Sequence, residues 1–362
     1  MAPRKPIVAV VKATPATVLA DYARVMQLAH YADFLPKDKP TALKINISWQ
    51  KFYPACSTTP WQLEGVIKTL LDGGYSRESL YACHNRTVVV SARKGEVRNK
   101  HKPVVEKYGL QNVHLYEGEE WVRYEPKAKM LVLGEIFPDG ILIPKRFIGA
   151  NILHLPTMKT HVFTTITGAM KNAFGGLLSE RRHWTHSVIH ETLVDLLAIQ
   201  KEIHPGIFAV MDGTFAGDGP GPRCMVPHVK NYILASGDMV AIDAVAAKMM
   251  GFDPLSIKFI RLAHEKGLGC GDVREIEIVG EDISRVNFQF DGLSDTFASR
   301  GQKLIYWGPL KPLENFLLRT ALAPWSYAAS ILYHDAFWYP FIGRGRVKKA
   351  LQTEWGKLFS TY

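Results

Sequence analysis

The sequence predicts an α/β protein built around a mostly parallel, Rossmann-like sheet with helices on both faces. The first observation behind this prediction is that short apolar segments alternate with helical patterns of about 12 residues or more, as in parallel strands joined by helices. The second is the composition. With 47% hydrophobic and 22% charged residues in a chain of 362, it excludes wholesale disorder and a coiled coil.

Each element follows from a local pattern. The helix at 60–71 is marked by Pro60, which suits a first helical turn, and by Gly73-Gly74, which suit a helix end. In chain order, the expected elements are a strand at 7–11, a helix at 16–29, a strand at 42–47, the helix at 60–71, strands at 80–83 and 152–155, a short helix after 168, a helix at 187–203, strands at 207–211 and 232–235, helices at 238–250 and 255–266, and a strand at 275–279.

Two regions depart from this pattern, so the sequence predicts three parts. Residues 1–85 and 149–301 would form the α/β core domain. Residues 86–148 are richer in charge and would form an inserted subdomain or lid of the α+β type, with short strands at 112–116, 130–133 and 141–143. Residues 302–362 would be an aromatic, basic C-terminal extension, and they hold 13 of the 39 aromatic residues.

Charge and cysteine content limit the classes of partner, cofactor and location that we expect. The formal net charge of +10 favours an anionic partner. Nucleic acid is disfavoured, because the basic residues form no continuous stripe and no RNA- or DNA-binding motif occurs. The four cysteines include no CxxC pair, which indicates a reducing compartment and disfavours a zinc ribbon or an iron–sulfur cluster. Because the start of the chain lacks signal-peptide features and no long apolar run occurs, the expected location is cytoplasmic, alone or peripheral at the inner membrane face.

The densest polar stretch, residues 156–176, follows an expected strand and predicts an anion site. Lysine charge, hydroxyl donors and a helix amino terminus together favour a bound anion, and ligands of α/β sheets lie at the carboxyl ends of strands. The candidate side chains in this stretch are Lys159, His161, Thr167, Lys171 and Asn172. The alternative is a loop whose threonines cap turns and whose lysines are solvated.

A second candidate anion cradle begins with Lys44 and Asn46 at the end of another expected strand. It continues through Thr58 to the amino terminus of the following helix.

Three histidines, His183, His186 and His190, fall at steps of three and four residues and would share one inward face of a helix. His186 could then move protons, as could His161, and His186 with His190 could hold a divalent metal ion. The alternative is that these are core histidines satisfied by backbone carbonyls.

Two aspartates are further candidates. Asp212 follows the strand at 207–211 and precedes a glycine-rich turn containing Gly219, so it could be a metal ligand, a base or a substrate clamp, unless it only caps the turn. Asp243 lies one turn into an apolar helix, where a buried carboxylate needs a partner, and a structural pairing is favoured.

Taken together, these segments resemble the uncharacterised family "domain of unknown function 362", sometimes labelled iron–sulfur centre proteins. The resemblance covers roughly residues 40–280. Its motifs are Lys44-x-Asn46, Thr58-Thr59-Pro60, Lys159-Thr-His161, Thr167-Gly-Ala-Met-Lys171-Asn172-x-Phe-Gly175, His186, Asp212-Gly213 with Gly219-Pro220, Ser236-x-Asp238 with Asp243-Ala, and Gly267-x-Gly269. It implies an α/β fold of unassigned chemistry. Many members carry a ferredoxin-like module with cysteine-rich motifs, which this sequence does not show.

The C-terminal extension indicates a second possible partner, a membrane surface. Residues 319–349 combine aromatic residues with a basic cluster, which favours contact with a membrane surface or a lid over a lipophilic substrate. The alternatives are a tail packed on the core or an interface in an oligomer.

Three functions remain open. The first is an enzyme for a small phosphorylated or carboxylated substrate bound at the strand ends, with acid/base or metal assistance, and lipophilic in part if the extension covers the site. The second is a redox protein that works with a separate ferredoxin. The third is a non-catalytic anion- or lipid-binding protein at a membrane.

Overall fold

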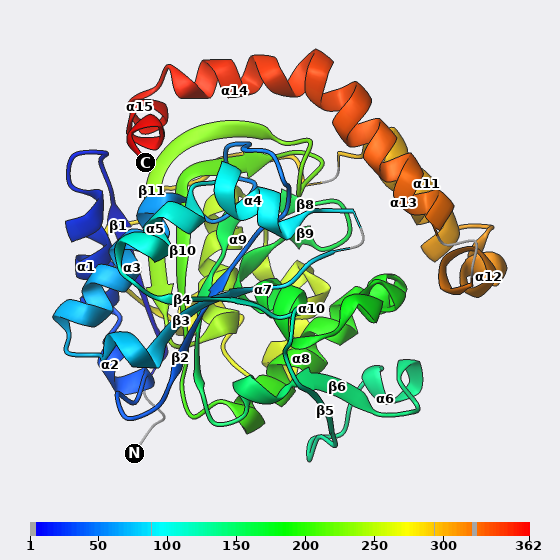
Figure 1. Ribbon diagram of the computed structural model, residues 1–362, viewed down its shortest axis with the longest axis horizontal. Coiled ribbons are helices and arrows are strands. Elements are labelled where there is room, and N and C mark those ends of the chain that lie inside the picture. Colours follow the sequence, from blue (N-terminus) through cyan, green and yellow to red (C-terminus); the bar gives the residue numbers. More distant parts are fainter. Residues whose placement is uncertain (1–4, 88, 293, 321–323) are drawn as a thin grey trace.

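A ten-stranded sheet lies at the centre of the protein (Figure 1). The structure is a computed structural model that describes residues 5–87, 89–292, 294–320 and 324–362. The strands of this sheet are β1 (Ile7–Lys12), β2 (Thr41–Ile45), β3 (Leu80–His84), β4 (Gln111–His114), β7 (Asn151–Leu155), β8 (Thr157–His161), β9 (Thr165–Ile166), β10 (Ile207–Asp218), β11 (Val226–Ser236) and β12 (Glu277–Gly280). Their order is β12–β1–β11–β10–β7–β2–β3–β4, with β8 and β9 attached beside β10.

Most neighbouring strands run parallel, which confirms the predicted fold class. Strands β10, β7, β2, β3 and β4 are parallel, whereas β11 is antiparallel to both β10 and β1. The carboxyl ends of β2, β3 and β7 therefore meet at one edge of the sheet, where ligands of such folds bind. A separate small sheet pairs β5 (Trp121–Tyr124) with β6 (Ile141–Pro144).

Helices cover both faces of the sheet, because alternate side chains of a strand point to opposite sides. Val8 and Val10 of β1 join one hydrophobic core, and Ala9 and Val11 join the other. The helices are α1 (Val18–Leu28), α2 (Tyr31–Phe34), α3 (Pro60–Asp72), α4 (Ala92–Arg98), α5 (His101–Lys107), α6 (Leu133–Ile136), α7 (Gly168–Leu177), α8 (Ile189–Ile203), α9 (Met239–Met250), α10 (Lys258–Glu265), α11 (Phe297–Tyr306), α12 (Glu314–Arg319), α13 (Pro324–Ile331), α14 (Arg344–Leu351) and α15 (Glu354–Thr361). Helices α1 and α3 pack on the second core, and α7 to α10 pack on the first.

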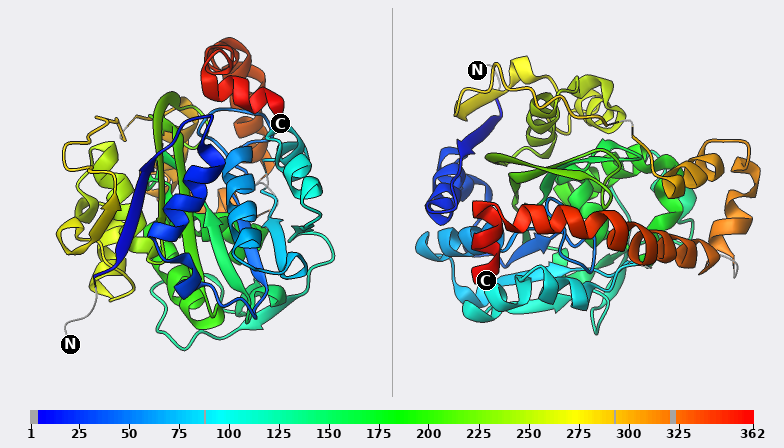
Figure 2. Two further views of the ribbon diagram at one scale, coloured as in Figure 1. Left: turned by 90° about the vertical axis from the view of Figure 1, so that its left-hand side faces the viewer. Right: turned by 90° about the horizontal axis from the view of Figure 1, so that it is seen from above.

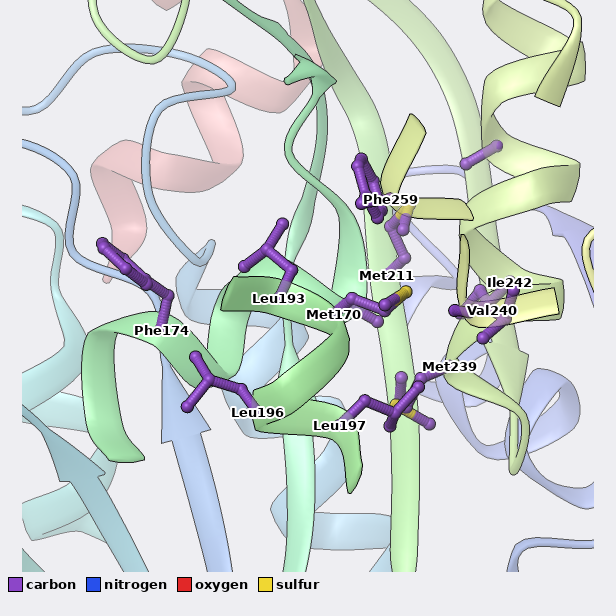
Figure 3. Close-up of a cluster of buried hydrophobic side chains, with 14 of the residues drawn as sticks. Met170, Phe174, Leu193, Leu196, Leu197, Met211, Met239, Val240, Ile242 and Phe259 are labelled. Carbon is purple, nitrogen blue, oxygen red and sulfur yellow. The ribbon is translucent and has the colours of Figure 1, made fainter. Parts of the chain in front are cut away.

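Helix α7 is held in place by the first core (Figure 3). Met170 of α7 is buried together with Leu193 and Leu197 of α8 and Met211 of β10. Burying one such side chain contributes about 1.5–3 kcal/mol, so this cluster fixes α7 firmly against the sheet. The polar residues that follow Met170 on α7 are thereby carried on a rigid element.

The chain from residue 297 onward forms an arm, here called the C-terminal arm, which crosses the top of the molecule and ends beside α3 (Figures 1 and 2). Between α13 and α14 it continues as a wide helical segment, η7 (Leu332–Gly343). The Trp49 Nε1 donates to the Asp335 carboxylate over 2.6 Å, and the Trp355 ring lies 5.2 Å from that of Trp61. These contacts attach the arm to the core at several points.

Two sequence predictions about elements are wrong. Residues 130–133 do not form a strand, because the backbone N–H groups of Leu131, Val132 and Leu133 donate to the carboxylate of Asp195 in α8. The strand expected at 207–211 does not stop there. It continues to Asp218, since β10 keeps pairing with β11 across a bulge. The region 86–148 places β4 at the edge of the main sheet and also contains the small β5–β6 sheet.

The Asp195 contacts generate a first prediction. Asp195→Ala removes the acceptor of three N–H groups, so the free energy of unfolding should fall by about 3 kcal/mol in urea denaturation. The control is Asp139→Ala, an exposed aspartate of the same region, which should change it by less than about 0.5 kcal/mol. Equal losses in the two variants would contradict the role assigned to Asp195.

Candidate functional site

A cavity of about 840 Å³ lies at the carboxyl ends of β2, β3 and β7. One side is formed by residues 44–48 at and after the end of β2, by the segment after β3, by Pro156 after β7 and by α7. The other side is formed by the C-terminal arm, from Phe297 to Phe337. The size is typical of a small-molecule site.

The structure brings seven of the candidate residues together around this cavity, namely Lys44, Asn46, His161, Thr167, Lys171, Asn172 and His186. Of the described residues that line it, none is an aspartate or glutamate, whereas Arg182 and Arg223 add further positive charge.

Lys44 is buried without a carboxylate partner among the described residues. Its Nζ donates to the Ile45 carbonyl oxygen over 2.6 Å, and burial lowers its pKa to about 8. The side chain passes over α7 at a glycine. A Cβ on Gly176 would lie 2.6 Å from Lys44 Cε, whereas one on Gly175 would lie 3.7 Å from Nζ. Glycine at 176 therefore makes room for the lysine.

Lys171 is half-buried and likewise forms no ion pair with a carboxylate in the described residues. Its Nζ lies 5.1 Å from the centre of the Phe174 ring, and burial, followed by the charges of Lys159 and Arg182, lowers its pKa to about 7. A positive charge that is desolvated in this way is costly unless an anion approaches it.

The two cavity histidines have complementary hydrogen-bonding roles. His161 Nδ1 accepts from the Phe163 N–H over 3.2 Å, so the neutral ring carries its proton on Nε2. His186 Nδ1 donates to the His183 carbonyl oxygen over 2.9 Å, which leaves its Nε2 as an acceptor. Burial lowers the pKa of both rings, to about 3 for His186.

The sequence placed the amino terminus of α7 at the anion site. In the structure, the N–H groups there are bound by a side chain of the protein, that of Asp243. The Asp243 carboxylate accepts from the N–H groups of Ala169 and Met170 over 2.5 and 3.0 Å. Gly168 has a φ of 71°, and a Cβ there would lie 2.4 Å from Asp243. The Thr167 hydroxyl, in contrast, is buried at the cavity with no hydrogen-bond partner in the described part of the chain.

Asp212 does not reach the cavity, contrary to the sequence expectation. It is fully buried, and its carboxylate accepts from the Tyr22 hydroxyl over 2.6 Å, the Thr59 hydroxyl over 2.9 Å and Trp61 Nε1 over 3.0 Å. The carboxylate therefore joins α1, α3 and β10. The continuation of β10 keeps it inside the sheet instead of at a turn.

Three other anion-site candidates lie outside the cavity lining. Lys159 Nζ donates to the Cys56 carbonyl oxygen and, over 3.1 Å, to Ser48 Oγ, and burial lowers its pKa to about 8. The Thr58 hydroxyl donates to the Leu155 carbonyl oxygen over 2.7 Å. Gly219 lines a second cavity of about 580 Å³.

The predicted metal set of Asp212, His186 and His190 does not come together. His183 and His186 lie in a 3-10 segment, Glu180–Val188, whereas His190 lies on α8, and Val188 between them has a non-helical backbone with φ −128° and ψ 36°. The His190 ring consequently stacks on Phe259 at 6.0 Å.

Sequence reasoning missed several wall residues. Arg182 comes shortly after the motif that ends at Gly175, and Arg223 comes shortly after Gly219-Pro220. Their positions beside these expected loops could have indicated that they line the site. His84, at the end of β3, had a comparable signal. The contact between His186 and Tyr306, whose rings stack at 6.0 Å, had none, because the two residues lie far apart in the chain.

The fold and the cavity define an α/β protein with a cationic pocket at the carboxyl edge of its sheet. The chain belongs to the family described as domain of unknown function (DUF362), whose model matches residues 41–248. It is similar to the thylakoid-associated protein sll1697 of Synechocystis sp., with 29% identity over 124 residues. That match covers 32% of this chain and 37% of the relative. No solved structure matches the chain.

The lowered lysine pKa values generate a second prediction. An unfolded lysine titrates near pH 10.4, so the folded state binds fewer protons between about pH 7 and 10. Burying the charged Lys171 therefore costs most below about pH 7, and this cost disappears as the pH rises. Lys171→Met should be more stable than the wild type at pH 6, and this difference in the free energy of unfolding should shrink towards pH 9, by at most about 1.4 kcal/mol per pH unit.

Urea denaturation at several pH values measures this difference. The control is Lys94→Met, which replaces an exposed lysine of α4 and should leave the wild-type curve unchanged. A pH-independent difference for Lys171→Met would mean that the amine is not desolvated.

Proposed function

We propose that the protein is an enzyme that binds a small amphiphilic anion, a phosphate or carboxylate with an apolar chain, in this cavity. The observation that carries the proposal is the division of the cavity into two unlike sides. Lys44 and Lys171 lie on one side with no acidic residue in the described lining, and apolar side chains of the C-terminal arm lie on the other.

The polar side suits an anionic head group. An anion between the two amines would replace the solvation that burial removed, and charge-assisted hydrogen bonds are about twice as strong as neutral ones. The Thr167 hydroxyl, which has no hydrogen-bond partner in the described residues, supplies a further donor at the same wall.

The apolar side suits a hydrocarbon chain. The arm contributes Leu304, Ile305, Leu310, Leu332 and Phe337 to the lining. Burial of each CH₂ group would add about 0.8 kcal/mol, so a long chain would contribute much of the affinity.

The histidines support proton transfer. His186 Nε2 is an acceptor at the cavity wall, and His161 Nε2–H is a donor. His186 would remove a proton from a bound hydroxyl or carbon acid, and an anion nearby would raise its low pKa.

Binding can be tested with dodecyl phosphate below its critical micelle concentration, measured by calorimetry. It should bind at least about 100-fold more tightly than methyl phosphate, which has the same head group. Dodecyltrimethylammonium, which has the same hydrocarbon chain but a cationic head, should not bind.

Lys171→Met should weaken the binding of dodecyl phosphate about 10- to 100-fold through loss of a charge-assisted contact. Gly176→Ala should weaken it through displacement of Lys44, and more than Gly175→Ala does.

Equal affinity for the anionic and cationic amphiphiles would reject the head-group assignment. Equal affinity for dodecyl and methyl phosphate would reject the apolar side.

A second candidate function, peripheral attachment to a membrane, is supported by the surface of the C-terminal arm. Of 18 large apolar side chains exposed in the described residues, 12 lie between residues 297 and 342. Three exposed cations lie on α14, directly after this stretch, namely Arg344, Lys348 and Lys349. Exposed apolar residues beside cations fit an anionic lipid surface.

Within the described chain, no helix has the length and hydropathy needed to cross a bilayer. Residues 321–323 of the predicted stretch 319–349 lie outside the described residues.

Sedimentation with phosphatidylglycerol vesicles tests this attachment. The double variant Phe316→Ser, Phe341→Ser removes apolar side chains that are 57% and 76% exposed, and should reduce binding about tenfold or more. The matched control is Leu142→Ser, Ile148→Ser, which removes side chains 46% and 47% exposed outside the arm. Equal reductions in both, or no sedimentation of the wild type, would contradict attachment through the arm.

A further inference from the structure

A second group of polar side chains lies beside the cavity and has no part in the function proposed above. His84 ends β3, His114 ends β4, and Glu96 lies on α4. Glu96 Oε2 is 2.8 Å from His84 Nε2 and 2.9 Å from His114 Nε2. The three ligand-type atoms lie within 4.8 Å of one another. Two imidazole nitrogens and a carboxylate oxygen thus converge from three separate elements.

The spacing of these atoms matches that around a metal ion. Ligands at about 2.1 Å from an ion lie about 3.0 Å apart when they subtend a right angle, and about 3.4 Å apart in a tetrahedron. The observed separations of 2.8 and 2.9 Å from Oε2 are close to these values. The three atoms lie within 4.8 Å of one another, so the two imidazoles would move closer together to share an ion.

Burial and charge point the same way. Glu96 is 3% exposed and His84 is 1% exposed. In the described residues, Glu96 forms ion-pair contacts with these two imidazoles alone. A divalent ion between the three side chains would compensate the charge of this buried carboxylate.

The outer contacts of the group also suit a metal. His114 Nδ1 is 3.4 Å from Glu117 Oε2, so a carboxylate stands behind this imidazole as it does in many metal sites. Such a contact fixes the ring so that its Nε2 lone pair is directed at the ion. His84 also lines the cavity, so an ion on its Nε2 would lie at the edge of the cavity.

We propose that His84, Glu96 and His114 form a binding site for a late first-row divalent cation, with Zn²⁺ as the best match. Nitrogen donors select such ions over Mg²⁺ and Ca²⁺, which prefer oxygen ligands. Three protein ligands leave a fourth position for water or a ligand.

The test uses the full chain without a histidine tag. Elemental analysis after purification in the presence of Zn²⁺ and dialysis should give about one Zn²⁺ per chain. Chelator-treated protein titrated with Co²⁺ should develop the visible absorption of a four-coordinate site. His114→Ala and Glu96→Gln should weaken Co²⁺ binding by at least tenfold, as loss of a ligand does. His228→Ala, which removes a histidine of β11 outside the group, should bind Co²⁺ like the wild type.

A measurement on the wild type alone covers the case in which the variants do not fold. Zn²⁺ should raise the thermal midpoint of the chelator-treated protein, and chelator should reverse the increase. Absence of retained Zn²⁺, of Co²⁺ absorption and of the thermal shift in the wild type would overturn the proposal, as would unchanged Co²⁺ affinity in a folded His114→Ala. Because none of these readouts uses an amphiphilic anion, the result is independent of the proposed function.

Discussion

Three lysine amines, two buried and one half-buried, have no carboxylate partner in the described residues, and the carboxyl edge of this sheet is arranged around this constraint. Removing an unpaired ammonium group from water costs several kcal/mol, so the fold must offset that cost locally. It does so with backbone carbonyl oxygens at Lys44 and Lys159 and with an aromatic ring at Lys171. None of these partners carries a negative charge. The amines of Lys44 and Lys171, which line the cavity, therefore keep a large part of their attraction for the anion that we propose, at the cost of stability in its absence. Sites that bind charge commonly make this exchange.

Such an arrangement needs rigid support, and two buried aspartates provide much of it. The Asp243 carboxylate takes up the N–H groups at the start of α7, which fixes the helix that carries Lys171. The Asp212 carboxylate ties α1 and α3 to β10 through a tyrosine, a threonine and a tryptophan. Both carboxylates are thus used inside the fold, which is why the cavity wall stays positive. Keeping both carboxylates away from the cavity wall is consistent with the proposed anion site, because a carboxylate at the wall would pair with the lysines and exclude the anion.

The sequence could predict those parts of the site whose position is set by local structure. Lys44 and Asn46 lie at the end of a buried strand, and Lys171 lies on the short helix after another, so the rule that ligands bind at the carboxyl ends of parallel strands placed them at one edge. The errors have long-range causes. The position of Asp212 depends on how far β11 pairs with β10, and the coil at 130–133 depends on Asp195, some sixty residues away. The aromatic composition of residues 302–362 showed that the arm is unusual but not where it lies. The group around Glu96 was missed because His84 ends a strand of the core, whereas Glu96 and His114 come from the region 86–148, whose fold could not be derived locally.

The C-terminal arm connects the two candidate functions by its geometry. Leu332 and Phe337 line the cavity and are nevertheless 67% and 56% exposed, so apolar surface continues from the inside of the cavity to the outside of the arm. An amphiphilic anion that moved from a bilayer to the lysines along this surface would keep its hydrocarbon chain out of water throughout, which avoids about 0.8 kcal/mol for each CH₂ group exposed. A cavity for a wholly polar anion would have no need of such a wall. The continuity of apolar surface therefore favours a ligand that is delivered from a membrane over one that is delivered from solution.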